Sequence, residues 1–498
     1  MRSDALHFNC GAHFQRSIIV FGAVVAAMAG AVLRLNAGAP VPGVMVVDII
    51  PEVLSGETNT NSEPSLGVNP RDPSQIAAWA FIPEPMGGKA TPIFISTDGG
   101  QTWSCRSTLP VLQKNSCDIT MRFGGLLNML YVAGLHDPKY IGPQDQYKPE
   151  LVICANDRLA KNPMQPVGGR GGEGVDQPHV AAATINKHDR VFIGDNDWNG
   201  PSGRTATIDR SLDGAGSSPA FTPIPIEFRN DAKDSSEVRP AISADGTKVY
   251  AAYNRVSAYN DDSRVGDVIL VRDDDGGNSA APFTALRGEN GVPGLPVVKA
   301  RTFAWDTLLG RDRNGGDLAI AVDPRNANTV YLVWGELVQG QPTLHIIRSD
   351  DAGVKWSTNL RTVTKAKNPG LAITANGTLG FLYQQVISPE NGQETWVTKL
   401  ERTKNSFGDT DTLTLATFPV AEVPTGNQPK LGDYLQLMAV GNDFYGIFSA
   451  SNVPDLTRFP CGVTFQRHVD LKAKTLLGLD GNKVAPSIDP FFVRVRGE

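Results

Sequence analysis

The sequence predicts an all-β protein built from repeated four-stranded sheets around a central axis, the β-propeller architecture. Three observations predict it. Short apolar strands recur in pairs from residue 44 to the end of the chain, and the turns beside them carry Asp-Gly, Asn-Gly or Asn-Pro. No stretch after residue 40 shows a sustained helical period. Because a closed ring protects the edges of its sheets, this pattern favours a single propeller domain over residues 40–498.

Each repeat opens on a polar residue that precedes a short apolar strand, a turn and a second strand. The opening residues are Glu63, Asp118, Asp176, Glu237, Asp317, Asn368 and Asp433. The separation between openings leaves room for four short antiparallel strands in each repeat. We therefore expect seven blades, with six as the alternative if the first or last repeat is shared. Val44–Ile50 and Phe491–Val495 are the candidate strands that close the ring.

Residues 1–39 have a different character. Residues 17–33 carry no charge, follow Arg16 and include Ala29-Gly30-Ala31, a small-residue cleavage pattern. These features predict a secretory signal peptide, and hence a secreted, periplasmic or cell-surface protein. The alternative is a retained membrane anchor, since the apolar run is at the short limit for a spanning helix. In that case the protein would contact the membrane through this segment alone.

Cysteine usage agrees with export. Cys10 precedes the apolar run, so four cysteines remain in the folded domain, which are Cys105, Cys117, Cys154 and Cys461. Four cysteines in an oxidising compartment predict two disulfides, for which three connectivities are allowed. We expect the pair Cys105–Cys117, whose members are close in sequence, and the pair Cys154–Cys461. Buried free thiols are the alternative.

The charge of the chain excludes one class of partner. The sequence has 46 Lys and Arg against 52 Asp and Glu, a formal net charge of −6 at pH 7. Nucleic-acid binding needs a basic face that displaces counterions from phosphates, so we expect no nucleic-acid partner. The sequence sets no oligomeric state.

A sharper motif lies in two of the turns. The segment Ser96–Trp103 fits the pattern S-x-D-x-G-x-T-W at every defined position, and Ser349–Trp356 fits it with Lys355 in place of Thr. In such a turn the aspartate accepts backbone N–H groups, the glycine takes a positive φ, and the tryptophan packs over the turn. The chain thus resembles the sialidase-like superfamily of propellers with BNR, or Asp-box, repeats. The resemblance implies a structural role on the rim for Asp98, Gly100, Trp103, Asp351, Gly353 and Trp356.

The resemblance also implies glycoside hydrolysis. Sialidases hold a substrate carboxylate with three arginines, and use a tyrosine nucleophile paired with a glutamate and an aspartate acid/base. The aromatic-Arg-Ile-Pro motif that carries the first arginine of the family is missing here, and the nearest match is Val238-Arg239-Pro240 in the fourth repeat. Nothing in the sequence groups the other candidate arginines, which are Arg122, Arg272, Arg301 and Arg348.

The candidate site is the ring of opening residues, because the first strand of each blade lines the central channel of a propeller. Carboxylates gathered there repel one another, which raises their pKa values, so they could serve as general acid and base. They could also bind Ca²⁺ through oxygen ligands, although no cofactor is required and the metal ligands stay undefined. The catalytic candidates are Glu237, Asp433, Tyr434, Asp176 and His179. The substrate-binding candidates are Glu63, Asp118, Arg239 and Asp317.

Two classes of function follow. The first is an exported carbohydrate-active enzyme, a sialidase-like glycoside hydrolase or a lyase, that acts on a glycan or polysaccharide at the channel face. The alternative is a non-catalytic propeller that binds a glycan or a protein at the cell surface. A metal-stabilised scaffold is a third hypothesis. In the structural interpretation, the opening acids only accept hydrogen bonds from the backbone of the neighbouring blade.

Overall fold

The computed structural model describes most of the chain after residue 40. The described residues are 41–58, 60–81, 91–109, 117–136, 150–156, 164–170, 174–200, 203–229, 234–305, 308–310, 317–388, 392–422 and 430–497. They belong to one compact unit, Asn36–Glu498, and their secondary structure is β-strands and short 3₁₀ helices. The predicted signal or anchor segment lies outside the described residues. Within them, no helix has the length and apolar character that crossing a membrane requires.

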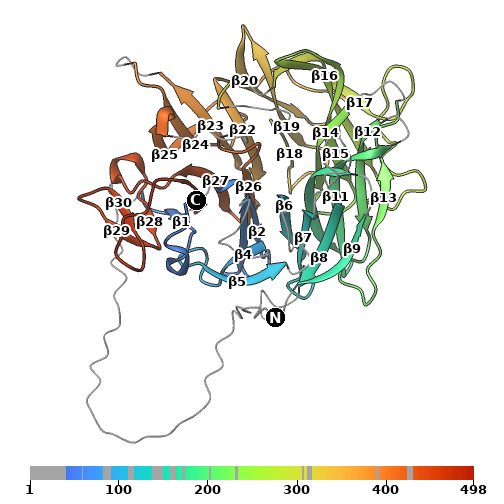
Figure 1. The fold of residues 1–498 in the computed structure, drawn as a ribbon. Coiled ribbons are helices and arrows are strands. Elements are labelled where there is room, and N and C mark those ends of the chain that lie inside the picture. Colours follow the sequence, from blue (N-terminus) through green and yellow to red (C-terminus); the bar gives the residue numbers. More distant parts are fainter. Residues whose placement is uncertain are drawn as a thin grey trace, which may run out of the picture. The chain divides into compact units, whose positions relative to one another are not determined.

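The described residues form six four-stranded antiparallel sheets in chain order (Figure 1). The first two sheets comprise β2 (Ser62–Val68), β3 (Ile76–Phe81), β4 (Thr91–Ser96) and β5 (Ser104–Leu109), then β6 (Cys117–Phe123), β7 (Leu130–His136), β8 (Glu150–Asn156) and β9 (Gln165–Arg170). The next two comprise β10 (Val175–Ile185), β11 (His188–Gly200), β12 (Gly203–Ser211) and β13 (Thr222–Pro225), then β14 (Asp234–Ile242), β15 (Val249–Tyr259), β16 (Ser263–Asp273) and β17 (Leu295–Ala304). The last two comprise β18 (Leu318–Val322), β19 (Val330–Val338), β20 (Gln341–Ser349) and β21 (Arg361–Thr364), then β22 (Ala366–Ile373), β23 (Leu379–Ile387), β24 (Thr395–Thr403) and β25 (Asp411–Pro419).

A five-stranded sheet joins the two ends of the described chain. Its order is β26 (Gln436–Val440), β27 (Asp443–Ser451), β31 (Ile488–Val495), β1 (Val44–Asp48) and β28 (Thr464–Phe465). β1 and β31 pair antiparallel from Val44↔Val495 to Asp48↔Phe491, which confirms the predicted closing strands. The remaining elements are the hairpin of β29 (His468–Asp470) and β30 (Thr475–Leu477) and the 3₁₀ helices η1 (Glu52–Leu54), η3 (Val420–Glu422) and η4 (Leu456–Arg458).

The sheets are arranged as a β-propeller. The innermost strands β2, β6, β10, β14, β18 and β22 contact one another in this order, and β26 contacts both β22 and β2. The four-stranded sheets in the described part of the chain number six, the count that the sequence left as the alternative to seven. The inner strand β26 of the five-stranded sheet lies between β22 and β2, and the strand that this sheet takes from the N-terminal side of the chain is β1.

The core is divided into slices between neighbouring sheets. In one slice Trp79 of the first sheet packs with Ile119 and Met121 of the second, all fully buried. In another, Phe492 and Tyr445 of the five-stranded sheet pack with Leu66 of the first sheet. Because each sheet buries both faces against its two neighbours, each added repeat adds its own share of core, as in other repeat architectures. This is how one domain exceeds the usual limit of a single core.

A buried ion cluster closes the ring. Arg467 pairs with Asp48 at the end of β1 and with Asp489 on β31, and the side chains of all three are inaccessible to solvent. The Arg467 Nη2–Asp48 Oδ2 distance is 3.0 Å. Burial raises the pKa of Asp48 to about 7, although Arg467 opposes the shift. The cluster therefore ties the N-terminal strand to the C-terminal strand with one cation between two carboxyl groups.

The two turns that fit the sequence motif share most of their side-chain hydrogen bonds. Asp98 Oδ1 accepts from the backbone N–H of Gln101 and Thr102, each at 3.0 Å, and the Trp103 indole donates to the Gly100 carbonyl at 3.0 Å. In the second turn Asp351 Oδ1 accepts from Lys355 N–H at 2.8 Å. Both turns join the third strand of a sheet to the fourth.

The glycines of these turns are required by packing. Gly100 has a φ of +92°, and a Cβ atom there would lie 2.1 Å from the Phe492 ring of the five-stranded sheet. Gly353 has a φ of +85°, and its Cβ would lie 2.5 Å from Leu270 of the fourth sheet. Only glycine meets both conditions, because other residues resist this φ and carry the clashing atom. These two turns therefore pack closely against the neighbouring sheet.

A third turn of this kind escapes the sequence pattern. Between β24 and β25, Thr403 Oγ1 accepts from Asn405 N–H and Phe407 N–H, as Ser96 Oγ accepts from Asp98 N–H and Gly100 N–H. Phe407 takes the positive φ of the glycine, at +68°. Hydrogen-bonding geometry is therefore kept where the residue types have changed.

One of the two predicted disulfides is wrong. Cys461 is a buried free thiol that donates to the Thr414 carbonyl, with an Sγ–O distance of 3.3 Å. Cys154, its expected partner, is on β8 of the second sheet, and the first sheet separates that sheet from the five-stranded sheet. The side chain of Cys117 lies outside the described residues, so the pair Cys105–Cys117 stays a prediction.

Candidate functional site

The inner strands begin with a repeated irregularity. The pairing register shifts near the start of β2, β6, β10, β14 and β22. At each shift one residue has a positive φ between +46° and +57°, and these residues are Glu63, Asp118, Gln177, Glu237 and Asn368. Such a φ is uncommon outside glycine, and β-bulges re-aim side chains. Five copies at one position indicate a common requirement for how this end of the channel is lined.

Side chains of this ring accept hydrogen bonds from neighbouring blades. Glu63 Oε1 accepts from Asp433 N–H at 3.1 Å, and Gln177 Oε1 accepts from Glu237 N–H at 3.4 Å. Asp317 Oδ1 accepts from Asn368 N–H at 2.8 Å. Each contact joins the inner strands of adjacent sheets. Part of the ring therefore serves to hold the blades together, as the structural interpretation expects.

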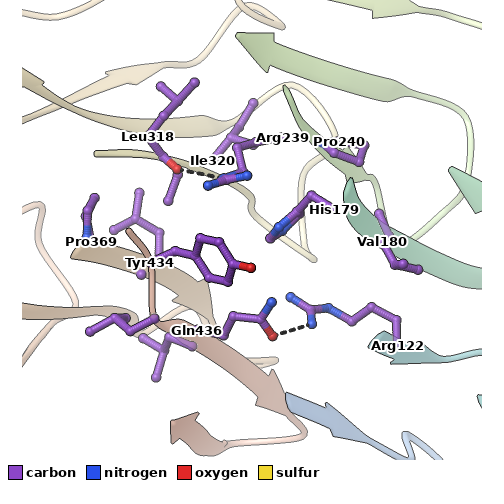
Figure 2. Close-up of a pocket in the computed structure, with 16 residues that line it drawn as sticks. Arg122, His179, Val180, Arg239, Pro240, Leu318, Ile320, Pro369, Tyr434 and Gln436 are labelled. Atoms are coloured by element: carbon purple, nitrogen blue, oxygen red, sulfur yellow. Dashed lines mark hydrogen bonds between the residues drawn. The ribbon is translucent and has the colours of Figure 1, made fainter. Parts of the chain in front are cut away.

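A cavity of about 100 Å³ lies between the inner strands, next to this ring (Figure 2). Its apolar wall comes from Leu318–Ile320 of β18 and Pro369–Leu371 of β22. Its polar lining comes from four other strands or their approaches, and comprises Arg122, His179, Arg239, Tyr434 and Gln436. Figure 2 shows the side chains of His179 and Tyr434 pointing toward one another, with an arginine on either side.

Arg239 is held in place by three contacts. Its guanidinium pairs with the carboxylate of Glu237, donates through Nε to the Leu318 carbonyl at 3.1 Å, and lies 5.8 Å from the centre of the Tyr434 ring. Glu237 is fully buried, and burial raises its pKa to about 7. The negative charge of Asp433 adds to this rise, while Arg239 opposes it. Glu237 thus fixes Arg239 and lies behind it, outside the cavity lining.

Arg122 faces Arg239 from another blade. It donates to Gln436 Oε1 at 2.8 Å, to the Leu66 carbonyl at 2.8 Å and to the Met121 carbonyl at 2.7 Å. Burial and the charge of Arg239 lower its pKa to about 10, so it stays a cation at neutral pH. Two like charges at one small cavity repel one another. An anion bound between them would relieve this repulsion.

His179 and Tyr434 are the two groups of the cavity that could transfer protons. Burial and the charges of Arg239 and Arg122 lower the pKa of His179 well below its usual value, so its imidazole is neutral. Burial and the charge of Asp118 raise the pKa of Tyr434, so its phenol keeps its proton. The Tyr434 hydroxyl donates to Asp118 Oδ1 at 3.2 Å. The cavity therefore combines a neutral base with an O–H donor.

The structure distributes the sequence-predicted residues over three places. His179, Tyr434 and Arg239 line the cavity, while Glu237 and Asp118 hold two of these side chains. Glu63 and Asp317 accept backbone hydrogen bonds between blades, and Asp433 donates its N–H to Glu63. Asp176 precedes the bulge of β10 and accepts from Gln177 N–H at 3.1 Å. The position in the ring belongs to Gln177, one residue later than predicted.

Sequence reasoning left Arg122 ungrouped and missed Gln436. Both could have been found from the two-residue period of a strand, since Arg122 follows Thr120 and Gln436 follows Tyr434 on the same face. Gln177 could have been found from the proline after it, because Glu63 and Asn368 are also followed by proline.

The three-arginine arrangement expected of a sialidase is not present in the described cavity lining. Arg301 is buried and donates to the Gly335 carbonyl and to Asn254. Arg272 and Arg348 pair with Asp274 and Asp350 beside the turns after the third strands. The two arginines in the described cavity lining are Arg122 and Arg239.

Calcium does not fit this cavity. The groups that line it include two arginines and no carboxylate, and a cation would be repelled. Across the described residues, no group of three or more His, Cys, Asp or Glu side chains is arranged to hold a metal ion.

Comparisons with known proteins give low similarity. No protein-family model matches the chain, and no curated protein matches it. Among solved structures, the GH74 enzyme of Niastella koreensis is 12% identical, with a TM-score of 0.35 over 82% of this chain and 76% of that chain. A PL25 ulvan lyase is 10% identical, with a TM-score of 0.44 over 78% and 92%. A Hadza microbial sialidase is 10% identical, with a TM-score of 0.40 over 75% and 70%. These scores are too low to transfer any activity to this chain.

Proposed function

We propose that this protein is a carbohydrate-active enzyme that acts on an acidic glycan at the central cavity. The observation that carries the proposal is the meeting of Arg122, Arg239, His179 and Tyr434 around one cavity. A guanidinium is the side chain best suited to bind a carboxylate, because its fork matches the two oxygens. The substrate is therefore a sugar that bears a carboxylate, such as a uronic acid.

The amide of Gln436 adds a donor for such a ligand. Its Oε1 is occupied by Arg122 and by Leu66 N–H, at 2.8 and 2.9 Å. Its Nε2 is buried at the cavity and has no hydrogen-bond partner among the described residues. An unpaired buried donor costs free energy, which a bound acceptor oxygen would recover.

The lining favours elimination over hydrolysis. Hydrolysis of a glycosidic bond usually needs two carboxyl groups beside the bond, and the described cavity lining has none. Elimination needs a cation that neutralises the uronate carboxylate, a base for the proton on the adjacent carbon, and an acid for the leaving oxygen. Arg239 and Arg122, neutral His179 and the Tyr434 phenol have these three properties.

The proposed step balances as follows. His179 takes the proton from the carbon next to the carboxylate, a carbon–carbon double bond forms, and the bond from the ring to the glycosidic oxygen breaks. Tyr434 gives its hydroxyl proton to that oxygen. In the free protein this hydroxyl donates to Asp118, and the glycosidic oxygen would take the place of that acceptor. Solvent then returns a proton to Tyr434 and removes one from His179.

An activity screen of the purified protein tests this proposal. The substrates are uronate polymers (polygalacturonate, alginate, chondroitin), sialosides and neutral xylan. Elimination yields a double bond conjugated to the carboxylate, which absorbs in the ultraviolet, and hydrolysis yields new reducing ends without that absorbance. We expect ultraviolet absorbance on at least one uronate polymer. Folded protein that is inactive on the whole panel would contradict the proposal.

A non-catalytic binding propeller is the second candidate, because several opening acids hold neighbouring blades together and so are committed to structure. It predicts retention of an acidic glycan without product.

We also propose that the turns around Asp98 and Asp351 are Asp boxes of the sialidase-like superfamily, that the five-stranded sheet acts as a seventh blade, and that residues 1–39 direct export. Mass spectrometry of the exported protein would test the last point, since a cleaved signal removes that segment.

A further inference from the structure

A group of aromatic and charged side chains lies at the tip of the hairpin between β15 and β16. Arg264 is between two aromatic rings, with its Cζ 4.8 Å from the centre of the Tyr259 ring and 4.5 Å from that of Trp305. Its guanidinium also donates to the Asn260 carbonyl at 2.6 Å. We call Tyr259, Arg264 and Trp305 the tip stack. Stacking of this kind holds a guanidinium and two rings in a fixed arrangement.

The hairpin is built to present these residues. The pairing of β15 with β16 shifts between Val256 and Ala258, a bulge that re-aims the residues beyond it. Tyr259 then pairs with Arg264, and Trp305 N–H donates to the Asp262 carbonyl at 2.9 Å, which ties the end of β17 to the tip. Tyr259 is 47% exposed, so part of its side chain is open to solvent.

The tip stack is at the same end of the fourth sheet as the ring of opening residues. β14 begins at Asp234, which pairs with Val256 of the antiparallel strand β15. β15 continues three residues further, to Tyr259, so the tip extends about 10 Å beyond the start of β14. The start of β14 also carries Glu237 and Arg239, the residues at the cavity. The hairpin of β15 and β16 that carries the tip stack therefore belongs to the same blade as Arg239, one of the two arginines that line the cavity.

The chemistry of the tip fits a sugar ring. Arg264 lies over one face of each ring, and the exposed part of the Tyr259 ring and the half-buried Trp305 ring can pack against the C–H face of a pyranose. Asp261 and Asp262 are exposed beside them and can accept hydrogen bonds from hydroxyl groups. These carboxylates disfavour a second uronate at this place, so the sugar bound here is one that offers hydroxyls rather than a carboxylate.

We infer that the tip stack is an outlying subsite that binds a neutral, hydroxyl-bearing sugar of the same glycan chain whose acidic sugar occupies the central cavity. The inference rests on the proposed function, and it narrows the substrate to a polymer in which acidic and neutral sugars occur together. The juxtaposition of a rigid aromatic stack and two exposed acceptors, above a cationic cavity of the same blade, supports it.

The experiment compares Trp305→Ala, Trp305→Phe and Tyr259→Ala with a control, Val354→Ala. Val354 is 52% exposed in the turn between β20 and β21, which lies at the opposite end of the neighbouring blade. All four changes are made in the His179→Ala background, so that the glycan is not consumed. Binding is measured by retardation in gels that contain unsulfated chondroitin, whose backbone alternates glucuronic acid with a neutral N-acetylated sugar, and by calorimetry with its long oligosaccharides and with a single glucuronic acid.

We expect Trp305→Ala and Tyr259→Ala to weaken binding of the long oligosaccharides at least fivefold, Trp305→Phe to retain most of it, and Val354→Ala to leave it unchanged. Binding of single glucuronic acid should be the same in all variants. Equal binding by Trp305→Ala and the control would overturn the inference, as would an absence of binding by the parent protein. If binding falls as expected while the unmutated protein releases no product, the subsite stands and the proposed activity fails.

Discussion

The Tyr434 hydroxyl donates a hydrogen bond to Asp118, with 3.2 Å between the hydroxyl oxygen and Oδ1. Asp118 lies near the start of β6 in the second sheet, and Tyr434 lies two residues before β26 of the five-stranded sheet, so the bond joins two sheets that both neighbour the first sheet. It aims the phenol at the cavity, and the negative charge at its far end keeps the phenol protonated. The same contact therefore sets both the position and the protonation state of the proposed acid.

Replacing Tyr434 with Phe should remove turnover while leaving the fold and glycan binding in place. The change deletes one hydroxyl, so the loss in the free energy of unfolding should be about 1 kcal/mol, while loss of a general acid lowers the rate about 10²–10⁴-fold. Initial rates and urea unfolding are measured together. Tyr383→Phe is the matched control. The Tyr383 hydroxyl also donates to a carboxylate, that of Glu401, at 2.7 Å, and neither residue lines the cavity. Equal rates in Tyr434→Phe and the parent would exclude Tyr434 as the acid.

The lowered pKa of His179 predicts a pH profile. A neutral imidazole is the competent base, so activity should persist at pH values below the usual histidine pKa of about 6.5. Because the unfolded chain binds a proton at higher pH than the folded one, the contribution of His179 to stability is present above about pH 6.5 and is lost as pH falls.

Removing one nearby charge tests the cause of this shift. In Arg122→Met, repulsion of the protonated imidazole is weaker, so the pKa of His179 should rise toward its usual value. NMR titration of the ring protons measures it directly, with Arg272→Met, a rim arginine, as the control. A pKa of His179 that is equal in both variants would mean that Arg122 does not contribute to the shift.

The architecture could be predicted from sequence because it depends on repeated local signals. Alternating apolar strands and the glycines of the turns act over a few residues, and each copy reinforces the assignment. The pairing of Val44–Asp48 with β31 could also be anticipated, since a ring needs a closing strand. The number of sheets was harder, because the last sheet draws β1 from one end of the chain and β31 from the other.

The site was less predictable because it depends on contacts between distant repeats. Arg122 and Arg239 are far apart in sequence, and only the closed ring brings them to one cavity. Acidic residues at the strand starts drew attention as catalytic or substrate-binding candidates, yet Glu63 and Asp317, both predicted to bind substrate, accept backbone hydrogen bonds. At the bulge of β10, the residue with the positive φ is Gln177, whereas the sequence pattern had placed Asp176 at this position. Pairing register and side-chain partners are properties of the folded chain, and residue type alone does not specify them.

The turn around Asp98 should contribute to stability and leave activity unchanged. Asp98 accepts hydrogen bonds from Gln101 N–H, Thr102 N–H and the Thr102 hydroxyl, and these bonds lower its pKa even though burial acts against them. Asp98→Ala removes them all, so the free energy of unfolding should fall by about 1–2 kcal/mol. Urea unfolding and initial rates are measured together. Asp98→Asn, which can still accept some of these bonds, should lose less. A large loss of activity in a folded Asp98→Ala variant would contradict a purely structural role.

The closing cluster of Arg467, Asp48 and Asp489 should make stability depend on pH in an unusual direction. The pKa of Asp48 is raised to about 7 in the folded protein, so between about pH 4 and 7 the folded chain holds a proton that the unfolded chain has released. Its contribution to stability is therefore full below about pH 4 and is lost as pH rises through 7. Asp48→Asn removes the titrating group but keeps an oxygen that can accept from Ile50 N–H.

Urea unfolding at several pH values from 5 to 8 compares this variant with the parent protein. The parent should lose up to about 1.4 kcal/mol more per pH unit than Asp48→Asn within the window. Other buried carboxyls titrate there too, since burial raises the pKa of Asp317 to about 6, and the difference between the two proteins isolates Asp48. Asp443→Asn, which breaks a partly exposed pair with Arg494 on the same sheet, should follow the parent. Parallel pH profiles for the parent and Asp48→Asn would show that Asp48 stays ionised beside Arg467.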